Sequence, residues 1–231
     1  MTGETRAVPH VPAGARYDGY ADWFESYNAP VAARDQGLVT GLIGPGQGDC
    51  LDLGCGPGLY FDAIRAAGRD PLGLDFSADQ LRLALPRGRC VQADAAALPF
   101  ADGRFPAVLM TWISTDVDDF AAVVREAARV LRPGGLLAFF GAHPCFSGPH
   151  VEYREDDTRV VHPTYRLAAW HEPQPWWGDG GPRSRVGIRH VPLAQFLHAF
   201  IDTGLVLEQV IEPKPRFPVP GSIALRLTRP A

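Results

Sequence analysis

Glycines and acidic side chains recur where short apolar segments of this chain end. Gly54, Gly56 and Gly58 follow one such segment, and Asp75 and Asp94 follow the next two. Glycines at a turn let the backbone fold tightly and let a ligand touch the main chain. A carboxylate at the position of Asp75 can accept hydrogen bonds from both hydroxyls of a ribose. A carboxylate at Asp94 can accept a hydrogen bond from the exocyclic amine of a base. The spacing therefore favours a nucleoside ligand.

Each feature also has a purely structural interpretation. The glycine turn (residues 54–58) alone is compatible with an ordinary tight turn. Asp75 precedes Ser77, so it can serve as an acid at the N-terminal end of a helix, and Asp94 can be a solvated turn residue. No Gly-Lys-Ser/Thr follows the turn, which excludes a phosphate-binding loop of that type. The glycine turn and Asp75 together favour the nucleoside interpretation.

The elements that must position these residues alternate between strands and helices. Apolar runs predict strands at 50–54, 72–75, 90–93, 107–111, 136–140, 205–211 and 222–228. Helical spacing and end signals predict helices from the glycine turn to Gly68 and over 77–85, 120–131 and 193–203. This order predicts an α/β, Rossmann-like fold with a mostly parallel seven-stranded sheet, helices on both faces and an antiparallel last strand.

Composition narrows the functional classes. The 231 residues carry a net charge of −4, and a binder of nucleic acid or of an anionic membrane usually carries a basic surplus. The four cysteines include no CxxC pair, and the histidines and acids of segment 142–192 match no metal-ligand spacing. The first residues lack the apolar core of a signal peptide. We expect a cytoplasmic protein with no metal, nucleic-acid partner or membrane segment.

Four segments in order resemble a known family. LDLGCGPG (51–58), LGLDFSADQL (72–81), VQADAAALPFADGRF (91–105) and VVREAARVLRPGGLLAFF (123–140) resemble the motif series of class I S-adenosylmethionine-dependent methyltransferases. They are most similar to the small-molecule branch related to the ubiquinone and menaquinone methyltransferases. The resemblance implies S-adenosylmethionine as cofactor, S-adenosylhomocysteine as product and a small-molecule acceptor. We expect the protein to be a monomer or homodimer.

The resemblance also implies roles around the cofactor. The backbone of Gly54, Cys55 and Gly56 would face the methionine portion, and Asp75 would hold the ribose. Thr111 would lie under the methionyl amine.

Four further residues would surround the adenine. Phe76 and Gln80 would lie beside its ring, and Asp94 and the backbone of Ala95 would read its edge. Tyr17 and Tyr20 resemble the lid tyrosines of related enzymes, although aromatic packing of a helix explains them equally well.

The sequence says less about how the acceptor is activated. Relatives often carry a His-rich stretch after the fourth strand, where this chain has TWISTDVDDF (111–120). A base is needed only where the acceptor must lose a proton, and the candidates are His143, Asp116 and His190. We expect His143, directly after the fifth strand, to be the catalytic residue, although a lone histidine is more often structural.

The acceptor is expected beside the insertion (142–192), an aromatic and proline-rich segment between the fifth strand and the last helix. Trp112, Trp170 and Trp176 would line its pocket, unless they merely pack the insertion onto the sheet.

The whole chain, 1–231, is then expected to be one methyltransferase domain. It would comprise N-terminal lid helices (1–48), the cofactor-binding core (49–141), the insertion and a terminal helix with strands (193–231). The acceptor would be a metabolite hydroxyl, amine or activated carbon. The alternatives are an NAD-dependent oxidoreductase and a protein that binds the cofactor without transferring a methyl group.

Overall fold

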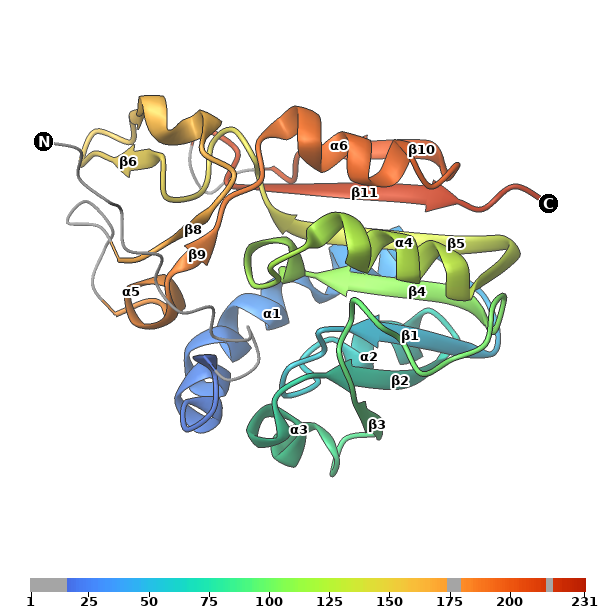
Figure 1. Ribbon diagram of the computed structural model, residues 1–231. Helices are drawn as coiled ribbons and strands as arrows, with labels where there is room; N and C mark the ends of the chain where they lie inside the picture. Colours follow the sequence, from blue (N-terminus) through green and yellow to red (C-terminus); the bar gives the residue numbers. More distant parts are fainter. Residues whose placement is uncertain (1–15, 174–179, 215–217) are drawn as a thin grey trace, which may run out of the picture.

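A seven-stranded sheet organises the chain in the computed structural model, which describes residues 16–173, 180–214 and 218–231 (Figure 1). Its strands follow the order β10-β11-β5-β4-β1-β2-β3. Their bounds are β1 Asp49–Leu53, β2 Asp70–Asp75, β3 Arg89–Gln92, β4 Phe105–Thr111, β5 Leu131–Ala142, β10 Val206–Ile211 and β11 Ser222–Thr228. Only β11 runs against its neighbours β5 and β10. The predicted fold, with its antiparallel last strand, is confirmed.

Helices cover both faces of this sheet because its central strands are apolar on both sides. In β4, Ala107 and Leu109 face a cluster with α1 (Ala21–Ile43), α2 (Phe61–Ala66) and α3 (Ala78–Ala84). The alternate residues Val108 and Met110 face α4 (Phe120–Val130) and α6 (Leu193–Ile201). Figure 1 shows α4 and α6 together on one face of the sheet.

Side chains cap the N-terminal ends of α3 and α4. Ser77 caps α3 by accepting a hydrogen bond from the Gln80 N–H, as its position predicted. Asp119 caps α4, whereas Asp116 and Asp118 precede the cap. The fifth strand begins at Leu131 rather than at residue 136, because Leu131 already pairs with Phe105 of β4 across a register shift.

The insertion contains short regular elements, although the sequence predicted no helix or strand within it. Two short antiparallel pairs occur in it, β6 (Val151–Tyr153) with β7 (Arg159–Val161) and β8 (Trp170–His171) with β9 (Ile188–Arg189). The short helices η3 (Pro163–Arg166) and α5 (Pro182–Val186) lie between them. The insertion sits beyond the carboxyl end of β4 (Figure 1). Within the described ranges, every helix is too short or too polar to cross a membrane.

Candidate active site

The glycine turn connects β1 to α2 through backbone conformations that favour glycine. Gly54 and Gly56 have φ values of 68° and 51°. The N–H groups of Gly54 and Cys55 both donate to the Leu74 carbonyl of β2, at 2.8 and 3.0 Å. A Cβ on Gly54 would lie 2.9 Å from Ile113 Cδ1, so a side chain there would displace the segment that follows β4.

Asp75 ends β2 beside this turn. Its Oδ2 accepts from the Gly56 N–H at 2.8 Å, and its Oδ1 accepts from the Ser77 N–H at 2.9 Å. Burial raises the pKa of Asp75, and the two backbone donors oppose that rise. The carboxylate is therefore fixed in orientation at the carboxyl edge of the sheet, where ligands of such folds bind.

A main cavity of about 490 Å³ opens at this edge. It brings together most of the site residues that we named from the sequence. Ten of them line it, namely Tyr17, Gly54, Gly56, Asp75, Phe76, Gln80, Asp94, Ala95, Thr111 and Trp112. The cavity therefore runs across the ends of β1, β2 and β4 and the loop after β3.

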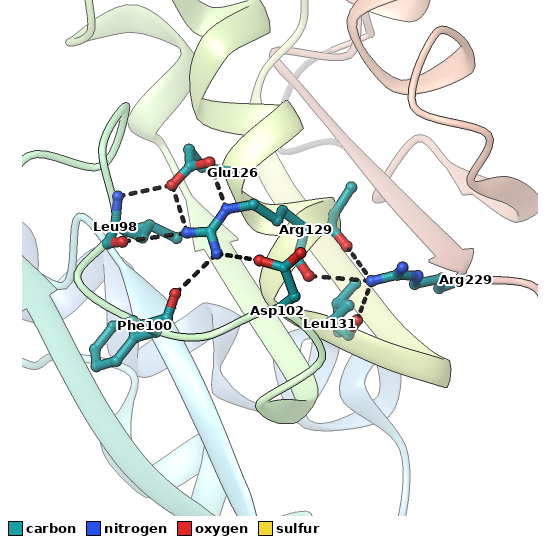
Figure 2. A network of polar contacts seen from close by, with 8 residues as sticks. Leu98, Phe100, Asp102, Glu126, Arg129, Leu131 and Arg229 are labelled. Atoms are coloured by element: carbon teal, nitrogen blue, oxygen red, sulfur yellow. Dashed lines mark hydrogen bonds and ion pairs between the residues drawn. The ribbon is translucent and has the colours of Figure 1, made fainter.

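Arg129 of α4 holds the loop that carries Asp94 and Ala95. Its guanidinium donates to the carbonyls of Leu98 and Phe100 at 3.1 and 2.8 Å. It also pairs with Asp102 at 2.6 Å and with Glu126 at 2.7 Å (Figure 2). Glu126 in turn accepts from the Leu98 N–H at 2.8 Å. This network fixes one wall of the main cavity from the opposite side of the loop.

A second cavity of about 220 Å³ lies between the glycine turn and α1. Tyr17, Thr111 and Asp116 line both cavities, so the two meet there. Cys55 lines the second cavity, while its thiol sulfur lies 2.7 Å from the place that a Gly73 Cβ would occupy, against β2. The side chain of Cys55 therefore packs on the sheet.

Asp116 is the centre of a polar cluster where the cavities meet. It accepts from the Tyr17 hydroxyl at 2.7 Å and from Arg183 Nη1 at 2.6 Å. Arg183 comes from α5 of the insertion and also donates to the Thr115 hydroxyl. Burial and then Asp116 raise the pKa of Tyr17 well above its ordinary value. The phenol therefore remains a hydrogen-bond donor.

Three predicted ligand contacts line neither of these cavities, and a fourth lies outside the described residues. Tyr20 is 37% exposed, and Trp170 lies under the guanidinium of Arg16; neither lines a cavity. Trp176 lies outside the described residues. His143, the expected catalytic residue, also lines neither cavity. Its Nε2 lies 3.0 Å from Glu212 Oε1, and its Nδ1 accepts from the Cys145 N–H.

His190, the third candidate base, has a structural role in the insertion. Its ring lies 4.2 Å from that of His150, centroid to centroid, and its Nε2 lies 2.7 Å from the Tyr165 carbonyl. Burial and then the neighbouring His150 lower the pKa of His190 to about 4. Within the described ranges, no group of three or more potential ligand side chains is placed to hold a metal ion.

Arg183 at the second cavity and the buried Asp52, which interacts electrostatically with Asp75, were not anticipated from the sequence. Arg183 gave no signal, because the insertion matches none of the four motifs. Asp52 precedes Gly54 by two residues and is fully buried, and both of its carboxylate oxygens lack a hydrogen-bond partner among the described residues. Burial, and then Asp75, raise the pKa of Asp52 well above its ordinary value. The acid within LDLG was the available signal for Asp52.

Comparison with known proteins assigns the core of this site. A family model described as a methyltransferase domain matches residues 51–139. This match covers less than half of the chain, and it contains the glycine turn, Asp75, Asp94 and Thr111.

Individual relatives agree with this assignment. The demethylmenaquinone methyltransferase of Mycobacterium marinum is 42% identical over 96 residues, which are 41% of this chain and 41% of that protein. The match thus spans less than half of that relative's own length. A solved S-adenosylmethionine-dependent methyltransferase from Mesorhizobium loti has a TM-score of 0.66 at 21% identity, over 92% of this chain and 99% of the other. The fold of the methyltransferase domain is therefore shared along nearly the whole chain.

Proposed function

We propose that this protein transfers a methyl group from S-adenosylmethionine to a small-molecule acceptor. One observation carries the proposal. The main cavity gathers the glycine turn, Asp75 and Asp94, from three separate strand ends, inside a segment that matches a methyltransferase domain. An NAD-dependent oxidoreductase, the other enzyme class that the glycine turn allowed, has no support from that match.

The residues that line the main cavity fit the cofactor chemically. Asp75 would accept hydrogen bonds from the ribose hydroxyls. Each of its carboxylate oxygens accepts from one backbone N–H and can accept a further hydrogen bond. Asp94 and the Ala95 backbone would read the adenine edge. The glycine turn and Thr111 would hold the methionine portion where the two cavities meet.

S-adenosylmethionine supplies an already electrophilic methyl group when it is bound. The protein must then mainly align the acceptor and exclude water, and good alignment contributes about 7–11 kcal/mol in favourable cases. Trp112 and Phe24 line both cavities and would give the acceptor an apolar contact. Of the three candidate bases, Asp116 alone lines the main and second cavities, so we assign Asp116 the role of accepting the proton that a hydroxyl acceptor loses.

The proposal is tested by turnover. The protein is incubated with S-adenosylmethionine and a panel of hydroxyl, amine and carbon acceptors, beginning with the reduced form of demethylmenaquinone because of the Mycobacterium marinum relative. We expect acceptor-dependent formation of S-adenosylhomocysteine. Binding of S-adenosylhomocysteine without turnover of any acceptor would favour a cofactor-binding protein that does not methylate.

A further inference from the structure

The charged residues that line the main cavity are all acidic, whereas the second cavity also has a basic residue. The main cavity is bordered by five carboxylates, those of Asp75, Asp94, Asp116, Asp118 and Asp119. The second cavity shares Asp116 with it and adds Arg183. Arg183 is the only lysine, arginine or histidine among the described residues that line either cavity.

The cofactor has a matching distribution of charge. S-adenosylmethionine carries a sulfonium, an α-ammonium and one α-carboxylate, and the carboxylic acids at the site complement the two cations. The carboxylate is at the end of the methionine portion, which the glycine turn would hold beside the second cavity. We propose that Arg183 of the insertion is the counter-ion of this carboxylate, an inference that rests on the proposed function.

Hydrogen bonds hold the guanidinium of Arg183, which lines the second cavity. Its Nη1 donates to Asp116 Oδ1 at 2.6 Å and lies 3.5 Å from the Tyr17 hydroxyl oxygen. Its Nη2 donates to the Thr115 hydroxyl. These contacts use the two terminal nitrogens and leave the Nε–H without a partner among the described residues. Although burial opposes the charged form, Asp116 raises the pKa of Arg183 above its ordinary value. The cation is thus permanent, and several contacts hold it in place before any ligand arrives.

The assignment gives the insertion a role in binding the cofactor. Arg183 lies on α5, and its contacts with Tyr17 and Asp116 join the insertion, the N-terminal segment and the segment after β4. A carboxylate bound by Arg183 would be a fifth member of the cluster of Tyr17, Thr115, Asp116 and Arg183. Helix α5 of the insertion would then lie beside the methionine end of the cofactor.

Calorimetry with two ligands on two proteins tests this role. The ligands are S-adenosylhomocysteine and its methyl ester, which keeps the ammonium and removes the negative charge. The proteins are the unaltered chain and Arg183→Gln. The control is Arg185→Gln on the same helix, since Arg185 lies 4.1 Å from the Trp23 ring centroid and lines neither cavity.

We expect the unaltered protein to bind the ester on the order of tenfold more weakly than S-adenosylhomocysteine, because a charge-assisted hydrogen bond is lost. Arg183→Gln should bind S-adenosylhomocysteine more weakly by a similar factor and should no longer distinguish the two ligands. Arg185→Gln should behave like the unaltered protein. If Arg183→Gln does not fold, Arg183→Lys replaces it in the test. Because the lysine keeps the positive charge, Arg183→Lys should retain part of the preference for S-adenosylhomocysteine over its ester.

Two results would overturn the assignment of Arg183. One is equal affinity of the unaltered protein for the two ligands, and the other is an undiminished preference for the carboxylate in Arg183→Gln. Failure of the unaltered protein to bind S-adenosylhomocysteine at all would instead overturn the proposed function, and this inference with it.

Discussion

The Asp75 carboxylate accepts a hydrogen bond from the Gly56 backbone N–H, with 2.8 Å between Oδ2 and N. This contact joins the end of β2 to the turn after β1, although the two residues are 19 positions apart. Both residues line the main cavity. One carboxylate therefore shapes the turn and presents its remaining lone pairs to a ligand.

Replacement of Asp75 should weaken cofactor binding strongly. We expect Asp75→Ala to reduce the binding free energy of S-adenosylhomocysteine by about 1.5–3 kcal/mol, because charge-assisted bonds to the ribose are lost. Titration calorimetry measures the change. Asp62→Ala is the control, since the Asp62 side chain is 87% exposed and pairs with Arg65 on the surface of α2. Equal losses in the two variants would refute the ribose role of Asp75.

Removal of the Arg129 side chain should loosen the loop after β3, which lines the main cavity. We expect Arg129→Ala to speed amide hydrogen exchange at Leu98 and Ala96 by at least about tenfold, because the loop after β3 loses its anchors in α4. Affinity for S-adenosylhomocysteine should fall at the same time.

The matched control for Arg129 is on the same helix. Arg125 has a side chain that is 61% exposed and lies 3.8 Å from Asp119, so Arg125→Ala should leave both measurements unchanged. Unaltered exchange in Arg129→Ala would show that the loop is held by its own turns.

The fold could be predicted because its signals are local. Alternating apolar runs marked all seven strands, and Ser77 marked the start of α3 where the structure has it. The start of β5 could not be predicted, since the pairing of Leu131 with Phe105 is a long-range contact that overrides the helix-ending glycines nearby. The short strands of the insertion depend in the same way on partners distant in sequence.

The site was predictable where a motif ties a residue to a strand end. The glycine turn, Asp75 and Asp94 line one cavity because the carboxyl ends of parallel strands meet at one edge. His143 also follows a strand, but its ring pairs with Glu212, and proximity in sequence did not reveal this. Arg183 reaches the site through the path of the insertion, so only the folded chain could identify it.

Acid should destabilise the protein through His190. Because the pKa of His190 is about 4 in the folded state and about 6.5 when unfolded, the unfolded chain binds more protons between these values. The free energy of unfolding should therefore fall as pH drops below 6.5, by about 2 kcal/mol from this residue at pH 5. Urea unfolding at pH 7 and pH 5 measures the loss.

Variants separate His190 from the other titrating groups. In His190→Gln the difference in unfolding free energy between pH 7 and pH 5 should shrink by about that 2 kcal/mol. His198→Gln is the control, because the His198 side chain is 66% exposed on α6. An unchanged difference in His190→Gln would show that the buried imidazole does not control the acid response.

The most direct test of the account is the choice of nucleoside by the unaltered protein. Titration calorimetry is carried out with S-adenosylhomocysteine and, separately, with NADH. We predict one-to-one binding of S-adenosylhomocysteine and no binding of NADH, because the glycine turn, Asp75 and Asp94 line one cavity and lie within a segment that matches a methyltransferase domain. Binding of NADH together with no binding of S-adenosylhomocysteine would contradict the central claim.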